Sequence, residues 1–130
     1  MKIRNFFCIM ISTLLMITLF AGCGSKYDDN VLTVREGRFD GYPNVPVGAA
    51  FDQFFADGQW DSFTSTENKT VVEFKGSCTW NNIPAKLRMQ FTVTGKRFEV
   101  NYFAIDGNPV TIEEGIDSIE KILSEYRPKK

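Results

Sequence analysis

Residues 70 to 105 contain three runs in which apolar and polar side chains alternate. A period of two places successive side chains on opposite faces of a β-strand, so each run predicts a strand with one buried face. The turns between the runs are expected at Asn81-Asn82 and at Thr94-Gly95-Lys96, where the residue types tolerate positive φ. Three strands joined by such short turns form an antiparallel meander.

The alternation also predicts which side chains face the core. They are Val72, Phe74, Gly76, Cys78 and Trp80 in the first strand, Ala85, Leu87, Met89, Phe91 and Val93 in the second, and Phe98, Val100 and Tyr102 in the third. The segment from Trp60 to Thr66 is a candidate fourth strand, although its aromatic residues do not keep period two.

Two helices are expected beside this sheet. Apolar residues at helical spacing follow Pro46 up to a stop at Gly58: Val47, Ala50, Phe51, Phe54 and Phe55. A second helix is expected after Thr111, which forms a capping-box pattern with Glu114, and its apolar face is Ile112, Ile116, Ile119, Leu123 and Tyr126. Val31 to Phe39 is expected to be a strand or an extended lead-in. The fold class is therefore α+β, a meander of three to four strands with a preceding amphipathic helix and a C-terminal helix.

The N-terminal segment has the organisation of an export signal. Lys2 and Arg4 precede an uncharged stretch from residue 6 to residue 20, which is shorter than the roughly 20 residues of a spanning helix. Small residues follow at Ala21 and Gly22, directly before Cys23. An ordinary secretory signal with a chance cysteine, or a short membrane helix, would also account for this organisation.

Phe20-Ala21-Gly22-Cys23 resembles the lipobox of bacterial lipoproteins. The resemblance implies that the chain is cut before Cys23 and that fatty acyl chains are attached to this cysteine, which anchors the protein to a membrane. Residue 24 is Gly and not the Asp that retains lipoproteins at the inner membrane, so a Gram-negative host would deliver the protein to its outer membrane. A Gram-positive host would hold it on the outer face of the cell membrane.

These features divide the chain into three parts: a signal peptide over residues 1–22, the lipidated cysteine with a flexible tether over 23–30, and one domain over 31–130. Loss of the signal peptide removes two of 15 basic residues and leaves 13 against 16 acidic ones, a net charge of −3. Clustered Lys and Arg are needed to bind phosphate backbones, so a nucleic-acid partner is not expected.

Residue usage argues against an enzyme. The chain has no His, which removes imidazole-based nucleophile activation and imidazole zinc sites, and no metal or cofactor is expected. Cys78 lies on an inward strand face and is expected to be a structural thiol without a disulfide partner. The adjacent carboxylates Glu113-Glu114 and Asp28-Asp29 have structural explanations at a helix start and in the tether.

The outward sheet face mixes charges of both signs: Glu73, Lys75, Lys86, Arg88, Glu99 and Asn101. Cross-strand ion pairs explain such a face, and a polar protein-binding surface is the alternative. If it binds a partner, the expected contact residues are Lys75, Lys86 and Arg88.

Beyond the lipobox, the chain resembles a family of small uncharacterised bacterial domains at Gly41-Tyr42-Pro43, the segment 47–52, Phe54-Phe55, Trp60, the segment 71–74 and Gly76. That resemblance covers most of residues 35–105 and implies no activity. The helix-then-meander order is more loosely similar to small outer-membrane assembly lipoproteins and to β-lactamase-inhibitor-like domains, which act by protein contact.

The leading hypothesis is a non-catalytic, membrane-tethered module of the cell envelope that binds another envelope protein. The alternative is a lipoprotein that binds a wall polymer or a small ligand, the small ligand in a pocket between the sheet and the helix carrying Phe51, Phe54 and Phe55. An enzyme that uses carboxylates alone is the last hypothesis.

Overall fold

The computed structural model describes residues 26–128 of the 130-residue chain. In this part the chain folds as α+β, with a five-stranded antiparallel meander in the order β1-β2-β3-β4-β5. The strands are β1 (Ala56–Thr64), β2 (Thr70–Trp80), β3 (Ile83–Thr94), β4 (Arg97–Ile105) and β5 (Asn108–Pro109). The helices are α2 (Asp29–Arg35), α3 (Val47–Phe54) and α4 (Ile112–Ser124). The predicted fold class is confirmed.

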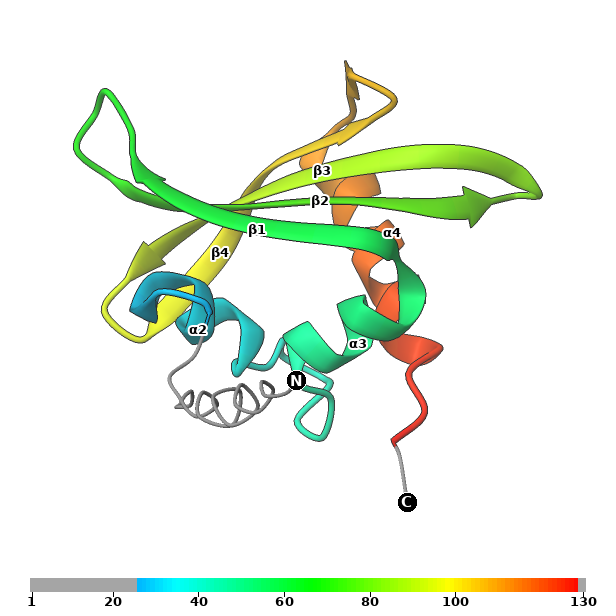
Figure 1. Cartoon of the computed structure of the whole chain (residues 1–130), viewed down its shortest axis with the longest axis horizontal. Helices are drawn as coiled ribbons and strands as arrows, with labels where there is room; N and C mark the ends of the chain where they lie inside the picture. The colour runs from blue at the N-terminus through cyan, green and yellow to red at the C-terminus, as the bar shows by residue number, and fades with distance from the viewer. Residues whose placement is uncertain (1–25, 129–130) are drawn as a thin grey trace, which may run out of the picture.

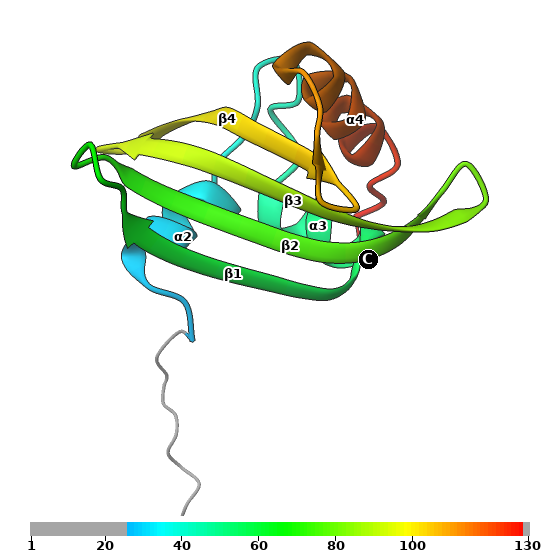
Figure 2. The same ribbon diagram turned by 90° about the horizontal axis from the view of Figure 1, so that it is seen from above.

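The helices cover only one face of the sheet. Helices α2 and α3 lie beneath it (Figure 1), and α4 packs beside β4, at the opposite edge from β1 (Figure 2). The core between the layers contains α3 and sheet residues, among them Phe51, Phe74, Phe91 and Phe103, all at most 1% exposed. No element within residues 26–128 covers the other face of the sheet, which we call the uncovered face.

The hairpins form where the turn residues predict them. Asn81 and Asn82 have φ values of 52° and 67°, and Gly95 has 61°, as tight turns between twisted strands require. The fourth strand is also confirmed, although it begins earlier than expected: Gly58 lies inside β1 and does not end α3. The helix instead ends at Phe54, because Phe55 takes an extended backbone and leads directly into β1.

The prediction for Val31–Phe39 was wrong, because this segment begins within the helix α2. Asp28 caps this helix, with its carboxylate accepting a hydrogen bond from the Val31 amide at 2.9 Å, and Val31 and Val34 are buried one turn apart. Asp28, Asp29 and Asn30, which were assigned to the flexible tether, belong instead to the cap and first turn of α2. The predicted signal peptide and Cys23 lie outside the described residues.

Tyr102 was wrongly placed on the inward face. Gln90 pairs with Tyr102 but Phe91 pairs with Val100, so Asn101 is an extra residue in β4. This β-bulge reverses the alternation after it. Phe103 becomes fully buried instead, and the Tyr102 ring lies against the Arg88 guanidinium on the uncovered face.

Helix α4 has the predicted capping box between Thr111 and Glu114, but its buried stripe is shifted. Its buried residues are Gly115, Ile119, Ile122 and Leu123. Ile112 and Ile116, which were expected in the core, are 39% and 43% exposed.

Candidate functional site

The three predicted contact residues lie together on the uncovered sheet face. Lys75 on β2 pairs directly with Arg88 on β3, and Lys86 lies two residues before Arg88 on the same strand face. They line an open hollow of about 390 Å³ together with Asp57 and other residues of the strand ends. The antiparallel pairing of β2 with β3 brings the three cations together.

Glu73 neutralises part of this cluster. Its carboxylate accepts hydrogen bonds from Arg88 Nε at 2.7 Å and from Gln90 Nε2 at 2.8 Å, and Lys75 Nζ lies 3.9 Å away. The residue is only 8% exposed although none of the helices α2, α3 and α4 covers it. Burial alone would raise the pKa of Glu73, but these hydrogen bonds and the positive charges outweigh it and hold the pKa below its ordinary value.

Two of the predicted contact residues therefore have partners within the sheet. Arg88 and Lys75 both pair with Glu73, whereas Lys86 forms no ion pair within residues 26–128. The Asp106 carboxylate also lies beside Lys86, where it accepts a hydrogen bond from the Lys86 amide at 2.9 Å. This arrangement is a mixed polar ladder and not a strongly basic patch.

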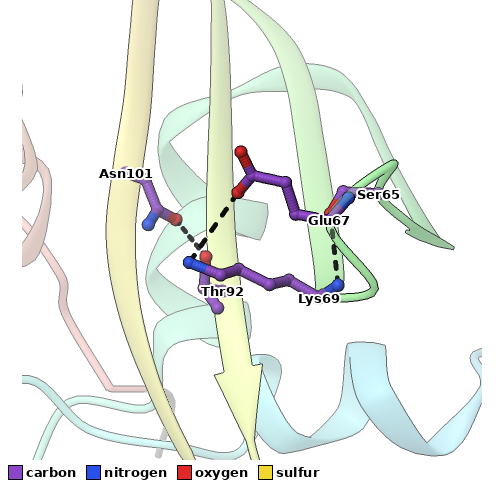
Figure 3. A network of polar contacts seen from close by, with 5 residues as sticks. All are labelled: Ser65, Glu67, Lys69, Thr92 and Asn101. Atoms are coloured by element: carbon purple, nitrogen blue, oxygen red, sulfur yellow. Dashed lines mark hydrogen bonds and ion pairs between the residues drawn. The ribbon is translucent and has the colours of Figure 1, made fainter.

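The opposite end of the uncovered face carries a second polar network (Figure 3). The Ser65 hydroxyl accepts hydrogen bonds from the backbone amides of Glu67 and Lys69, both at 3.2 Å, which shapes the β1–β2 loop. On the strands beside this loop, the Thr92 hydroxyl donates to the Asn101 side chain at the bulge. Each of these contacts orders a loop or a strand irregularity, so the network has a structural explanation.

The pocket expected between α3 and the sheet is filled by aromatic rings. The Phe74 ring centroid lies 4.9 Å from those of both Phe51 and Phe55, and Trp60 stacks on Phe51 at 5.7 Å. Edge-to-face and stacked rings at these distances form a packed core. This part of the molecule has no room for a ligand.

Cys78 is half-buried on the inward side of β2 and is not part of a disulfide. Burial, followed by the negative charge of Asp106, raises the pKa of its thiol. A thiol with a raised pKa holds little thiolate at neutral pH and is a poor nucleophile. The geometry supports the predicted structural role.

The paired carboxylates have structural roles where the structure describes them. Asp28 caps α2 and Asp29 lies in its first turn, while Glu113 and Glu114 lie in the first turn of α4. Within residues 26–128, no three or more Cys, Asp or Glu side chains are grouped so that they could hold a metal ion. In the same part of the chain, none of the helices combines the length and the apolar character needed to cross a membrane.

An apolar groove lies between α4, β4 and the loop at residues 39–42. It has a volume of about 460 Å³, and we call it the α4 groove. Its apolar lining consists of Phe39, Tyr42, Phe98, Val100, Ile112 and Ile116, above the buried Ile119 and Leu123. This site was not predicted, because Ile112 and Ile116 were assigned to the core. The sequence does contain one signal for this site: α4 has more apolar residues than a single buried face of the helix can cover.

The rim of the α4 groove is acidic. Asp40 and Glu120 line it, and no Lys or Arg does. Glu99 also borders the groove, but its position between Phe98 and Val100 directs its side chain to the uncovered face. Neither the Asp40 nor the Glu120 carboxylate forms an ion pair with a cation in the part of the chain that the structure describes. An apolar floor with an unneutralised acidic rim is suited to a ligand that is both apolar and cationic.

Comparisons of this chain with models of protein families, with curated protein sequences and with solved structures found no match.

Proposed function

We propose that this chain is a lipid-anchored protein of the bacterial cell envelope, and that its domain is a non-catalytic module that binds another envelope protein. The sequence from Phe20 to Cys23 supports the anchor, through its resemblance to a lipobox. The observation that carries the binding role is the α4 groove. Ile112 and Ile116 in this groove are about two-fifths exposed, and apolar clusters rimmed by polar residues are typical of protein interaction sites.

Membrane tethering suits a module with a small interface. A groove of about 460 Å³ accepts only a few side chains, so the intrinsic affinity for a partner is modest. Confinement to one membrane raises the effective concentration of the domain toward other envelope components. Modest affinity is then sufficient for a specific complex.

Chemical cross-linking in intact cells tests the proposal. The lipidated protein is cross-linked, purified and analysed by mass spectrometry, with a form lacking Cys23 as the control. One reproducible envelope protein, trapped by the anchored form and depleted in the control, is the expected result. Absence of any protein beyond the background of the control would contradict the proposal.

A small apolar ligand or a wall polymer is the second candidate. The volume of the α4 groove falls within the roughly 300–1,000 Å³ that is typical of small-ligand sites. In the same experiment, recovery of lipid or wall polymer without a protein would favour this function.

A further inference from the structure

We propose that the α4 groove binds a segment of the partner protein that carries aliphatic side chains flanked by Lys or Arg. This inference rests on the proposed function and adds the chemistry of the partner to it. The contact surface would be the groove, and not the Lys75, Lys86 and Arg88 cluster on the uncovered sheet face.

The aliphatic part of the ligand follows from the groove floor. Ile112 and Ile116 expose apolar surface one turn apart on α4, and Phe98 and Val100 continue that surface onto β4. Removing such surface from water is favourable. Branched aliphatic side chains of the partner are the groups that would fill a groove of this lining.

The cationic part of the ligand follows from the rim. Asp40 comes from the loop and Glu120 from α4, so carboxylates from two elements border the apolar floor. Because no cation among the described residues pairs with them, they are available to a ligand. Lys or Arg next to the aliphatic anchors would complement them.

The same rim argues against other occupants. Phospholipid headgroups and anionic polymers carry phosphate or carboxylate, which the Asp40 and Glu120 carboxylates repel. A second copy of this chain offers its basic end, residues 127–130, but that segment has no aliphatic or aromatic side chain to fill the floor. A segment of a different protein satisfies both requirements.

The groove is also preorganised. Ile119 and Leu123 beneath it are each 2% exposed, and Phe39 packs edge-to-face on Phe98 with ring centroids 5.5 Å apart. Gly37 brings the loop close to β4, since a Cβ at this position would lie 2.4 Å from the Phe98 ring. A surface held by buried side chains loses little entropy when a partner binds.

Site-specific photo-cross-linking tests the proposal in the full-length lipidated protein in its own cells. A photoreactive residue replaces Ile116 in the groove. As a matched control it replaces Ile83, an isoleucine that is 64% exposed at the start of β3 and does not line the groove. A third probe replaces Lys86 on the uncovered face. We expect position 116 to trap one envelope protein through a peptide that contains Leu, Ile or Val beside Lys or Arg, while position 83 traps none of it.

Charge reversal on α4 provides the second arm. Glu120→Lys should lower the yield of that cross-link by about three- to tenfold, because one attractive contact becomes repulsive. Asp117→Lys is the matched control, since Asp117 is exposed on the same helix but does not line the groove, and it should leave the yield unchanged.

Four outcomes would overturn the inference. Position 116 could trap a lipid, a wall fragment or a second copy of the chain. The yield could respond equally to Glu120→Lys and Asp117→Lys. A protein trapped only from position 86 would also refute binding at the α4 groove, but would leave the proposed protein-binding function standing. The absence of protein at all three positions would contradict both the groove as the binding site and the proposed function.

Discussion

Glu73 is a nearly buried carboxylate on a sheet face that no helix covers. Lys75 and Arg88 are directly opposite each other on β2 and β3, and like charges in that arrangement repel. Glu73 lies next to both and offsets this repulsion with its own charge. One residue thus makes a cross-strand pair of cations compatible with the sheet.

The pH dependence of stability should report this role. The pKa of Glu73 is lowered in the folded protein, so its contribution is present above the unfolded pKa near 4.5 and is lost as the pH falls through the folded value. Glu73→Gln should lower the free energy of unfolding at pH 7 by about 1 to 2 kcal/mol, and the difference from the wild type should shrink toward pH 3. Urea denaturation at pH 7 and at pH 3 measures both effects.

The control for this prediction is Glu67→Gln, which removes an exposed carboxylate whose nearest cation is 3.9 Å away. Its effect should stay below about 0.5 kcal/mol at either pH. If Glu73→Gln behaved like this control, the carboxylate would have no stabilising role.

Gly115 shows how tertiary packing can outweigh helix propensity. It lies in α4, where Ala would be favoured over Gly by up to about 1 kcal/mol. A Cβ at this position would lie 2.8 Å from Cβ of the buried Phe103, so the helix would have to move away from β4. Overpacking of this kind costs about 1 to 3 kcal/mol.

We therefore expect Gly115→Ala to lower the free energy of unfolding by about 1 kcal/mol despite the better helix former. Asp117→Ala, at an exposed position of the same helix, should change it by less than about 0.5 kcal/mol. Thermal unfolding of the two variants makes the comparison. Stabilisation by Gly115→Ala would show that α4 is not packed closely on Phe103.

At the level of elements, α2 is joined to the rest of the domain by polar contacts as well as by Val31 and Val34. Asp28 caps the helix and also accepts a hydrogen bond from the Ser62 hydroxyl on β1. At the other end, Arg35 pairs with Asp52 of α3 at 2.8 Å and lies 4.5 Å from the Tyr27 ring centroid. A seven-residue helix needs such contacts, because an isolated helix of that length is not stable in water.

The substitution Asp28→Ala distinguishes a capped helix α2 from the flexible tether that the sequence predicts. In a tether the substitution would have no effect. As the cap of α2 it should lower the free energy of unfolding by about 1 to 2 kcal/mol. Denaturant unfolding of Asp28→Ala and of the neighbouring Asn30→Ala makes the measurement, and equal stability of the two variants would rule out a capping role.

The sequence predicts an element well when the signal is local. The β2–β3 and β3–β4 hairpins have alternation and turn residues in adjacent positions, and the start of α4 has a complete capping box. Helix α2 was missed because its β-branched residues favour a strand and its stabilising contacts come from α3 and β1. The bulge at Asn101 was missed because one extra residue in a strand leaves no separate mark on the alternation of the chain.

The α4 groove could not be predicted from the sequence either. Its lining comes from the loop at 39–42, from β4 and from α4, which are brought together only by the tertiary fold. Ile116 has the same helical spacing as a core residue, so periodicity alone cannot show that its neighbours leave it exposed. By contrast, Lys75, Lys86 and Arg88 were placed correctly on one face because they belong to a single hairpin.

In the whole molecule, the chain enters the domain on the β1 side and the α4 groove lies on the β4 side (Figure 2). The sheet order separates β1 from β4 by three inter-strand spacings, which is about 14 Å. Cys23 is three residues before Lys26, a span of at most about 11 Å. An anchor on Cys23 would therefore hold the β1 edge near the membrane and leave the groove at the far edge, accessible to a partner.

This arrangement depends on acylation at Cys23, which the three cysteines of the chain allow to be tested with internal controls. Cys23→Ala should remain uncleaved and should not incorporate a fatty-acid label, whereas Cys8→Ala and Cys78→Ala should be processed and labelled like the wild type. One acyl chain binds a membrane only marginally, so the two or three chains of a mature lipoprotein are needed for stable attachment. Metabolic labelling followed by membrane fractionation measures both properties. Normal labelling of Cys23→Ala would refute the anchor, and the protein would then reach its partner without the high effective concentration that a shared membrane provides.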